Sequence, residues 1–216
     1  MSNKIFDAAS LKNKTIYWIG GSPCSGKSSV AEILCEKFDF HYYKCDDFLE
    51  NYLERGVSEN IDIMNKFANM DLDQTWINRS INEQVSDEFL FYKESFKYII
   101  NDLCNLQIDK QGIIVEGAAL LPQLICSMRI PFGNYVCIIP TKEFQVTEYS
   151  KRDWAREYLK ECSDPEIAFK NWMQRDINFA EIVKENALEL NMNLIVENGD
   201  KDISFKVDKV IKYWSL

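Results

Sequence analysis

The sequence contains one histidine, five prolines and eight glycines among its 216 residues. The lone histidine, His41, argues against a Ser-His-Asp triad and against a His-rich zinc site, so we expect any general base to be a carboxylate. Because proline and glycine are scarce, no Pro/Gly/Ser-rich linker divides the chain. The sequence also shows no internal repeat and no low-complexity tract. We therefore predict one domain over residues 1–216.

Long hydrophobic runs are absent as well. No apolar run approaches the roughly 18 residues that cross a membrane, and the opening segment MSNKIFDAASLKNK lacks the apolar core of a signal peptide. The seven cysteines are odd in number, scattered and never spaced C-x-x-C. Most lie in apolar segments, where a free thiol packs as a small hydrophobic group. These features predict a cytoplasmic protein, in a reducing compartment, with no membrane partner.

Positive charge is in short supply, because 25 lysines and arginines stand against 34 acidic residues and leave a net charge of −9. The phosphates of a nucleic-acid polymer would meet a repulsive field, which argues against such a partner. A local basic pocket for a small phosphorylated ligand is compatible with this balance. The 46% of hydrophobic residues and 13% of aromatic residues are enough for a large core.

Short apolar runs alternate with helical patterns along the chain. Near-continuous apolar runs are typical of strands that are covered on both faces of a parallel sheet. We predict such strands at 15–20, 40–45, 112–116, 134–139 and 192–196. Apolar residues at helical spacing follow the first strand (Val30, Ile33, Leu34, Phe38), precede the third (Val85, Phe89, Tyr92, Phe96, Ile99, Ile100, Leu103) and end the chain (Ile203, Val207, Val210, Ile211, Trp214). The alternation predicts an α/β layered fold with two helical insertions, at about 48–105 and 142–190.

The segment GSPCSGKS at 21–28 has the spacing G-x-x-x-x-G-K-S and lies between a predicted strand and a predicted helix. Backbone N–H groups of such a loop point into one concavity, and the start of the helix adds the positive end of its dipole. Lys27 can then reach the β- and γ-phosphates of a nucleotide, and the Ser28 hydroxyl can join the shell of Mg²⁺. A glycine-rich turn that matches by chance is the alternative, but the flanking strand and helix favour the phosphate site. The residues predicted to bind the nucleotide here are Gly21, Ser22, Pro23, Cys24, Ser25, Gly26, Lys27, Ser28 and Ser29.

Through GSPCSGKSS the sequence resembles the P-loop NTPases, whose Walker A motif has this form. It contains no N-K-x-D motif for guanine recognition and no L-S-G-G-Q-like signature. Its size and its two helical insertions resemble the small P-loop kinases that act on nucleosides, nucleotides and antibiotics. This resemblance implies a three-layer α/β sandwich with a five-stranded parallel sheet in the order 2-3-1-4-5. It also implies ATP and Mg²⁺ as cofactors, a substrate-side insertion after the second strand and a lid after the fourth.

Carboxylates at two predicted strand ends are candidates for catalysis and metal binding. Asp46 follows the second strand, in YYKCDDFLENYLERG, and can act as the base for an acceptor hydroxyl. Kinases similar to chloramphenicol phosphotransferase and to the zeta-toxin kinases carry an aspartate at this point. The alternative is that Asp46 or its neighbour Asp47 caps a short helix that stops at Gly56.

Glu116 ends the third predicted strand in GIIVEGAALLP, where open α/β sheets bind ligands. Beside a phosphate loop this carboxylate can hold Mg²⁺ or contact the substrate; a carboxylate that caps the following turn is the alternative. Nucleoside monophosphate kinases usually read D-G-x-P-R at this position, whereas this chain reads E-G-A-A. That difference argues against a nucleotide as the acceptor.

Arginines follow the fourth predicted strand in TEYSKRDWAREYLK. Arg152 and Arg156 are four residues apart, so we expect them on one face of a helix. In the resembled kinases, lid arginines close on the phosphates and neutralise charge in the transition state, and Arg175 is a third candidate for this role. The alternative is that these arginines pair with acidic neighbours on a solvated helix surface.

The loop after the last predicted strand, in IVENGD, contains Gly199 and Asp200. In the resembled kinases this loop lies against the adenine base, so both residues are candidates for nucleotide binding; an ordinary Asn-Gly turn is the alternative. The segment 76–95 would line the acceptor pocket in that fold, although its apolar members fit the core face of a helix. Cys24 lies near a helix start and near Lys27, two features that favour a thiolate.

The sequence therefore predicts an ATP- and Mg²⁺-dependent phosphotransferase that uses a hydroxyl of a small molecule as acceptor. Lys27, Asp46, Arg152 and Arg156 are the catalytic candidates, and the metal candidates are Ser28 and Glu116. A nucleoside or nucleotide kinase is a second hypothesis, and a non-catalytic ATP-binding switch or regulator is a third. The identity of the acceptor and the oligomeric state stay open at this point.

Overall fold

Five parallel strands form one sheet in the order β2-β3-β1-β4-β5 in the computed structural model, which describes residues 11, 14–128 and 134–216. The strands are β1 (Ile16–Gly21), β2 (His41–Lys44), β3 (Ile113–Glu116), β4 (Tyr135–Pro140) and β5 (Asn193–Glu197). Each strand begins and ends within one residue of its predicted range, and the predicted α/β fold and strand order are confirmed. The expected absence of a signal peptide concerns residues 1–14, most of which lie outside the described part.

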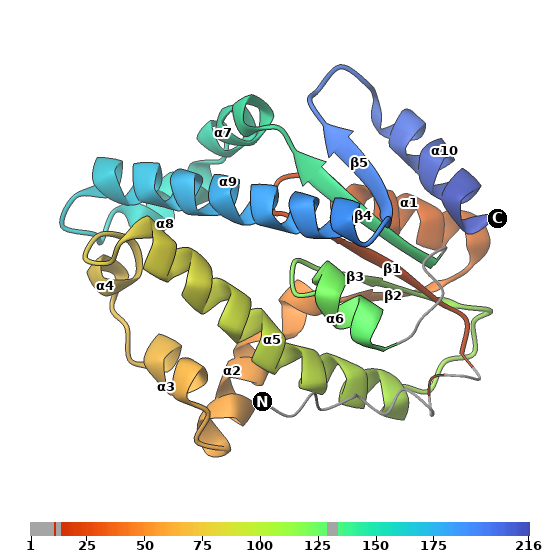
Figure 1. Ribbon diagram of the computed structural model, residues 1–216, viewed down its shortest axis with the longest axis horizontal. Helices are drawn as coiled ribbons and strands as arrows, with labels where there is room; N and C mark the ends of the chain where they lie inside the picture. Colours follow the sequence, from red (N-terminus) through yellow and green to blue (C-terminus); the bar gives the residue numbers. More distant parts are fainter. Residues whose placement is uncertain (1–10, 12–13, 129–133) are drawn as a thin grey trace.

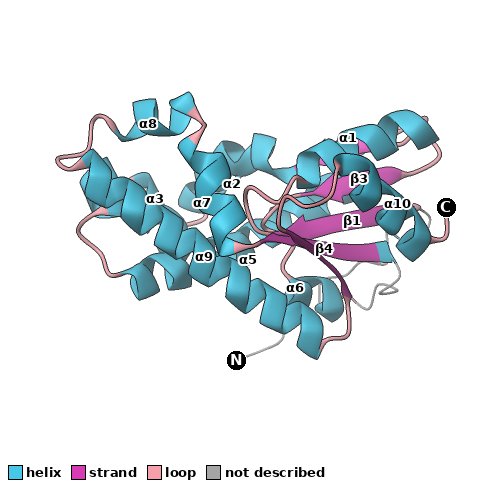
Figure 2. Cartoon of the chain, turned by 90° about the horizontal axis from the view of Figure 1, so that it is seen from above, coloured by secondary structure: helices cyan, strands magenta, loops and turns pink. Residues whose placement is uncertain are grey.

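Helices cover both faces of the sheet (Figures 1 and 2). The helices on one face are α1 (Lys27–Phe38) and α10 (Ile203–Trp214), and those on the other are α5 (Ile81–Asn105), α6 (Pro122–Ser127) and α9 (Pro165–Glu189). Ile16 and Trp18 of β1 belong to the core beneath α5, α6 and α9, whereas Tyr17 and Ile19 belong to the core beneath α1 and α10. Because successive side chains of a strand point to opposite faces, covering both faces requires the uninterrupted apolar runs of the sequence.

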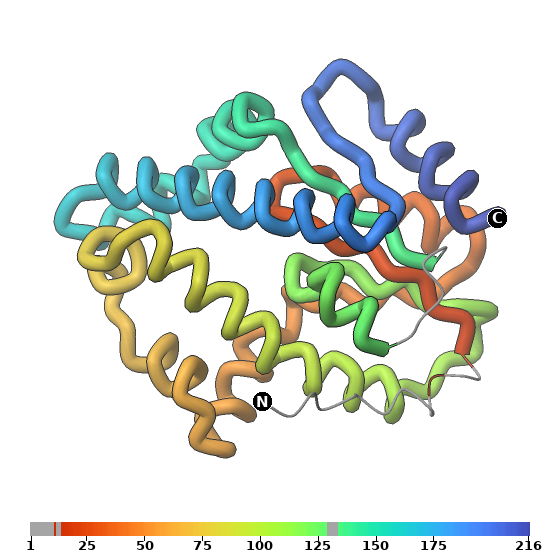
Figure 3. Tube along the Cα trace, viewed as in Figure 1, coloured from red at the N-terminus to blue at the C-terminus, as the bar shows by residue number. Residues whose placement is uncertain are grey.

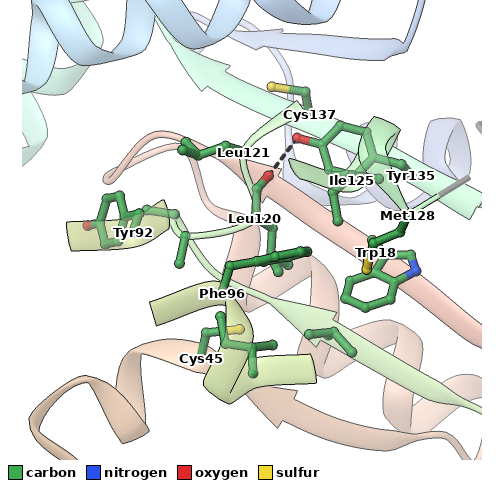
Figure 4. Close-up of a cluster of buried hydrophobic side chains, with 14 of the residues drawn as sticks. Trp18, Cys45, Tyr92, Phe96, Leu120, Leu121, Ile125, Met128, Tyr135 and Cys137 are labelled. Atoms are coloured by element: carbon green, nitrogen blue, oxygen red, sulfur yellow. Dashed lines mark hydrogen bonds between the residues drawn. The ribbon is translucent and has the colours of Figure 1, made fainter. Parts of the chain in front are cut away.

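The larger core lies between the sheet and α5, α6 and α9 (Figure 4). Trp18 and Phe96 are almost completely buried in it, and removing such a side chain from water stabilises the fold by about 1.5–3 kcal/mol. The Tyr135 hydroxyl is buried in the same region and donates a hydrogen bond of 3.0 Å to the carbonyl oxygen of Leu120. This core joins the sheet to the long helices of both insertions.

The two predicted insertions form helices that meet on one side of the molecule (Figures 1 and 3). The first contains α2 (Leu49–Ser58), α3 (Asp62–Ala68), α4 (Leu72–Trp76) and α5, and the second contains α7 (Lys142–Ser150), α8 (Asp153–Leu159) and α9. Trp76 of the first stacks on Trp172 of the second with ring centroids 4.8 Å apart. Both belong to a separate apolar cluster with Tyr149, Leu159 and Met173.

The expected helix stop at Gly56 is wrong, because α2 continues through Gly56 to Ser58. Gly56 is buried, and a Cβ atom at this position would overlap the Met64 side chain. The glycine therefore allows α2 and α3 to approach each other closely rather than ending a helix. None of the helices in the described ranges is long and apolar enough to cross a bilayer.

Candidate active site

The segment between β1 and α1 folds into a tight loop around the Lys27 side chain. Gly21 has φ of +123° and lies so close to β4 that a Cβ atom would overlap the carbonyl oxygen of Ile138. Gly26 adopts the left-handed conformation, with φ of +80°, directly before the first residue of α1. The Lys27 ammonium turns back over the loop and donates a hydrogen bond of 2.8 Å to the carbonyl oxygen of Ser22. The two glycines of the motif therefore occupy positions that disfavour any other residue.

Glu116 lies next to this loop at the end of β3. Strand β3 pairs with β1 in parallel, and Glu116 is the sheet partner of Ile19. Its side chain is only 1% exposed. Oε2 accepts hydrogen bonds from the Ser28 hydroxyl at 3.1 Å and from the Tyr42 hydroxyl at 2.9 Å. Oε1 lies 3.7 Å from the Lys27 ammonium. Among the described residues, the Glu116 side chain therefore contacts Ser28, Lys27 and Tyr42 and not the backbone of the turn after β3.

Tyr42 is a member of this group that the sequence did not single out. Burial and the nearby Glu116 carboxylate raise the pKa of Tyr42, so it stays a neutral hydroxyl that can donate to Glu116. Tyr42 belongs to the predicted aromatic strand, and Lys44, two residues on, is the sheet partner of Glu116. Residues two apart on a strand share a face, so the signal was present but needed the register of β2 against β3.

Three buried polar atoms around Lys27 have no hydrogen-bond partner among the described residues: Ser22 Oγ, Ser25 Oγ and Glu116 Oε1. Leaving such atoms unpaired costs free energy, and a bound group that pairs with them would recover it. Hydroxyl donors and an ammonium suit phosphate oxygens, and a carboxylate oxygen suits Mg²⁺ or its water ligands. These residues therefore fit a polyphosphate and a divalent cation.

Protein side chains alone would form only a small part of such a cation site. No group of three or more His, Cys, Asp or Glu side chains in the described ranges is placed to hold a metal ion. Mg²⁺ in phosphate-transfer sites is typically bound by one or two carboxylates together with substrate phosphates and water. Ser28 and Glu116, which are hydrogen-bonded to each other, can make this limited contribution.

Asp46 lies in a 3₁₀ turn, Cys45–Phe48, that directly follows β2. The residue that precedes α2 as its N-cap is Phe48, so the alternative in which Asp46 or Asp47 caps that helix is wrong. The Asp46 carboxylate packs beside Gly117, where an added Cβ atom would lie 3.4 Å from Oδ1. Part of the Asp46 surface is exposed to solvent, but the surrounding protein still desolvates the carboxylate and raises the pKa of Asp46. Lys27 opposes this rise in pKa, and Glu116 adds to it. Asp46 is thus close enough to Lys27 and Glu116 for both charges to affect its pKa.

Asp47 has different surroundings. Its side chain is 63% exposed and lies 3.5 Å from the ammonium of Lys44. An exposed pair of this kind contributes little to stability. Of the two adjacent aspartates, Asp46 is therefore the one coupled to Lys27 and Glu116.

The structure separates the two predicted lid arginines. Helix α7 ends at Ser150 and α8 begins at Asp153, so Arg152 lies in the break and Arg156 inside α8. The expected common helical face is therefore wrong. The Arg152 guanidinium donates to Cys24 Sγ at 3.3 Å. Arg156 is exposed and takes part in no hydrogen bond or ion pair among the residues that the structure describes. Of these two arginines, Arg152 is the one that contacts the loop at residues 21–28.

Arg175, the third lid candidate, is part of an internal ion cluster. Its Nε lies 3.2 Å from Glu88 Oε2, and its Nη2 lies 2.5 Å from Asp176 Oδ1. Burial raises the pKa of Glu88 to about 7, against the lowering effect of Arg175. The guanidinium also stacks over the Trp76 ring, 4.7 Å from its centroid. Through its contacts with Glu88 of α5 and Asp176 of α9, Arg175 ties the two helices together. The contact with Glu88 could not be predicted from the sequence.

The expectation of a favoured thiolate at Cys24 is wrong. Burial raises the pKa of Cys24, and the opposing effect of Arg152 does not overcome it. Cys24 packs against the apolar cluster that contains Trp76 and Trp172. A thiol against this cluster is desolvated, and desolvation disfavours the charged form more than the loop lysine favours it.

A cavity of about 760 Å³ lies between the first insertion and α8. Its lining is mixed, with aromatic, hydroxyl and charged side chains: Phe67, Met70, Asp71, Leu72, Asp73, Thr75, Trp76, Tyr158, Glu161 and Arg175. Trp76 comes from the segment 76–95 that we expected to line an acceptor pocket. Another cavity, of about 820 Å³, lies between α5 and α9. None of the predicted phosphate-binding residues lines either cavity.

The loop after β5 forms a hydrogen-bonded turn, as the alternative for this segment had it. The Asn198 side chain donates to the Asp200 carboxylate at 2.6 Å and accepts from its backbone N–H at 3.1 Å. Gly199 has φ of +84°, and an added Cβ atom would lie 3.0 Å from the Phe144 ring. Its N–H donates to Glu197 Oε1 at 2.7 Å. Contact of Gly199 and Asp200 with adenine stays a prediction.

Comparisons with known proteins find likeness in structure but none in sequence. No family model matches the chain, and no curated protein is significantly similar to it. A shikimate kinase from Acinetobacter baumannii, solved in complex with shikimate, superposes over 95% of both chains with 13% identity and a TM-score of 0.50. The protein TT1252 from Thermus thermophilus covers 93% of this chain and 96% of its own, with 14% identity and a TM-score of 0.53. A gluconokinase from Sinorhizobium meliloti 1021 gives 15% identity, 94% and 91% coverage, and a TM-score of 0.49. The chain has the fold of the P-loop small-molecule kinases.

Proposed function

We propose that this protein is an ATP- and Mg²⁺-dependent phosphotransferase that transfers the γ-phosphoryl group to a hydroxyl of a small molecule. The observation that carries the proposal is the convergence of Lys27, Glu116 and Asp46 at the carboxyl ends of three neighbouring strands. A phosphate-binding cation, a metal-binding carboxylate and a base are the parts that such chemistry requires. The shared fold with a kinase that was solved with its small-molecule substrate supports this reading.

The loop residues would bind and orient the phosphates. Lys27 would exchange its bond to the Ser22 carbonyl for phosphate oxygens, and the Ser22 and Ser25 hydroxyls would gain partners. Ser28 and Glu116 would hold Mg²⁺, and the ion would neutralise charge on the phosphates. Tyr42 keeps the Glu116 carboxylate in place by donating to Oε2. Little covalent chemistry is left to the protein, since positioning and charge stabilisation dominate phosphoryl transfer.

Asp46 would accept the proton of the acceptor hydroxyl as that oxygen attacks phosphorus. It lies beside the loop and, within the described part of the chain, its side chain forms no hydrogen bond or ion pair with a loop residue, so a base role is open to it. Its raised pKa brings it nearer to neutral pH, and this makes a carboxylate a better proton acceptor. The acceptor itself would lie in the cavity of about 760 Å³, a volume within the usual range of roughly 300–1,000 Å³ for small-molecule sites.

A kinase screen tests the proposal. Purified protein with MgATP is offered nucleosides, sugars, sugar phosphates and aminoglycoside- or phenicol-like alcohols, and ADP release and acceptor mass are measured. We expect one class to raise ADP release above the acceptor-free rate and to gain the mass of one phosphoryl group. Phosphorylation of nucleosides alone would instead support the nucleoside-kinase hypothesis. Binding of MgATP without transfer to any acceptor would support the switch, and absence of MgATP binding would contradict the proposal.

Arg152 and Arg156 provide a matched pair of variants for the lid. Arg152→Ala should lower kcat by about 10-fold or more, because it removes a cation that lies beside Cys24 of the phosphate loop and can stabilise transition-state charge. Arg156→Ala removes the same charge from an exposed site only four residues away, and we expect kcat to change less than two-fold, roughly the effect of a distant surface charge. Steady-state kinetics of both variants, with thermal unfolding as a check on folding, measure the difference. Equal effects would remove Arg152 from the catalytic group.

A further inference from the structure

A second buried lysine lies at the phosphate loop, on the side of α10. Lys206 is only 7% exposed and forms an ion pair with Glu197, which is only 4% exposed and ends β5. The pair uses Glu197 Oε2, while Oε1 accepts the N–H of Gly199 at 2.7 Å. Burying two charges is costly even when they are paired. The pair therefore calls for an explanation beyond the stability of the fold.

The Lys206 ammonium also lies against Gly26 of the phosphate loop. An added Cβ atom on Gly26 would be 2.8 Å from Lys206 Nζ. Gly26 is the residue directly before α1, whose first turn contains no acidic side chain. A cation at this end of a helix opposes the helix dipole, which is already positive there. The placement is unfavourable for α1 by itself, so the stability of that helix does not account for it.

Glu197 and Lys206 together connect two loops that lie at opposite ends of a bound nucleotide in the proposed function. One Glu197 oxygen holds the turn that contains Gly199, the predicted adenine-side loop. The other holds Lys206, which contacts Gly26 on the phosphate side. We propose that Glu197 and Lys206 are positioning residues that fix the adenine-side loop relative to the phosphate loop. This inference rests on the proposed binding of ATP.

If Glu197 and Lys206 hold the two loops in place, their loss should weaken the binding of some ligands and not of others. Loss of the Lys206 ammonium leaves Glu197 buried without its cation and frees the turn at Gly199 from Gly26. The interactions of adenine with the turn at Gly199 then weaken. The N–H groups of the loop at residues 21–28 and the Lys27 ammonium are still available to the phosphates. The variants should therefore lose affinity for a ligand that carries a nucleobase, and they should keep their affinity for a bare polyphosphate.

Calorimetry on the full chain tests this with MgATP and with the magnesium complex of inorganic tripolyphosphate. Lys206→Met and Glu197→Gln should each raise the Kd for MgATP by about 10-fold, the size expected for a charged hydrogen bond, and should leave the Kd for tripolyphosphate within about two-fold. Lys206→Arg keeps the pair and should restore MgATP affinity. Lys212→Met, which removes an exposed lysine of the same helix, is the matched control and should change neither Kd.

The remaining outcomes contradict the inference in separate ways. Unchanged MgATP affinity in Lys206→Met or Glu197→Gln would show that the pair has no positioning role. An equal loss for both ligands would make Lys206 a phosphate ligand instead. If Lys206→Met does not fold, Glu197→Gln decides, because it keeps side-chain size and an oxygen acceptor for Gly199. A wild-type protein that does not bind MgATP would overturn the proposed function and not this pair alone.

Discussion

Replacing Lys27 with methionine should lower kcat/KM by roughly 10²–10³-fold or more, or abolish measurable MgATP binding, and leave the fold intact. Lys27 is 6% exposed, and its ammonium lies between the Ser22 carbonyl, at 2.8 Å, and Glu116, at 3.7 Å. In the proposed function this ammonium is the main cation for the β- and γ-phosphates. Methionine has a similar length and fills the same space, so the loss is one of charge and hydrogen bonding.

Lys37→Met is the control for this variant, since Lys37 is an exposed residue in the last turn of the same helix. Both variants remove one positive charge from α1. Isothermal calorimetry gives the MgATP affinity, steady-state assays give kcat/KM, and thermal unfolding reports the fold. If Lys27→Met behaves like Lys37→Met in binding and turnover, the loop does not bind phosphate and the proposed function fails.

Replacing Asp46 with asparagine should lower kcat by roughly 10²-fold or more, with the Kd for MgATP within a few-fold of wild type. Asparagine keeps the size of the side chain but cannot accept the proton of the acceptor hydroxyl. Asp47→Asn is the matched control, because Asp47 is the adjacent residue, has the same chemistry and is exposed beside Lys44. We expect this control to retain most of the activity.

The pH dependence gives a second measurement on Asp46. The base must be ionised, and its raised pKa means that it takes up a proton at a higher pH than an ordinary aspartate does. Activity of the wild type should therefore fall on acidification before the usual aspartate range is reached, and Asp46→Asn should lack this limb. If Asp46→Asn retains wild-type turnover, Glu116 or Asp47 becomes the candidate base.

The sequence determined the sheet and the phosphate loop because the physics of both is local. Strands that are covered on both faces must be apolar along their whole length, and all five were placed within one residue. Gly21 and Gly26 occupy conformations that glycine adopts most readily, so the motif spacing between a predicted strand and a predicted helix was enough to predict the loop. The strand order came from the resemblance that this loop carries, and the structure agrees with it.

Local signals failed where a residue had two compatible environments. Gly56 is typical of a helix end, yet it lies inside α2 because Met64 packs against it. Arg152 and Arg156 have helical spacing, yet α8 begins only after Arg152. Arg152 therefore lies between two helices, and of the two arginines it is the one that contacts Cys24. Cys24 lies near a cation and a helix start, but its burial against the second insertion raises the thiol pKa.

Only the tertiary structure decided which charged groups form ion pairs with each other. Glu88 and Arg175 are far apart in sequence and meet because α5 packs on α9. Glu197 and Lys206 meet because α10 returns along the sheet to the phosphate loop. A sequence shows which residues carry charge, but the free energy of a buried charge depends on its partner, and that partner is chosen by how the helices pack.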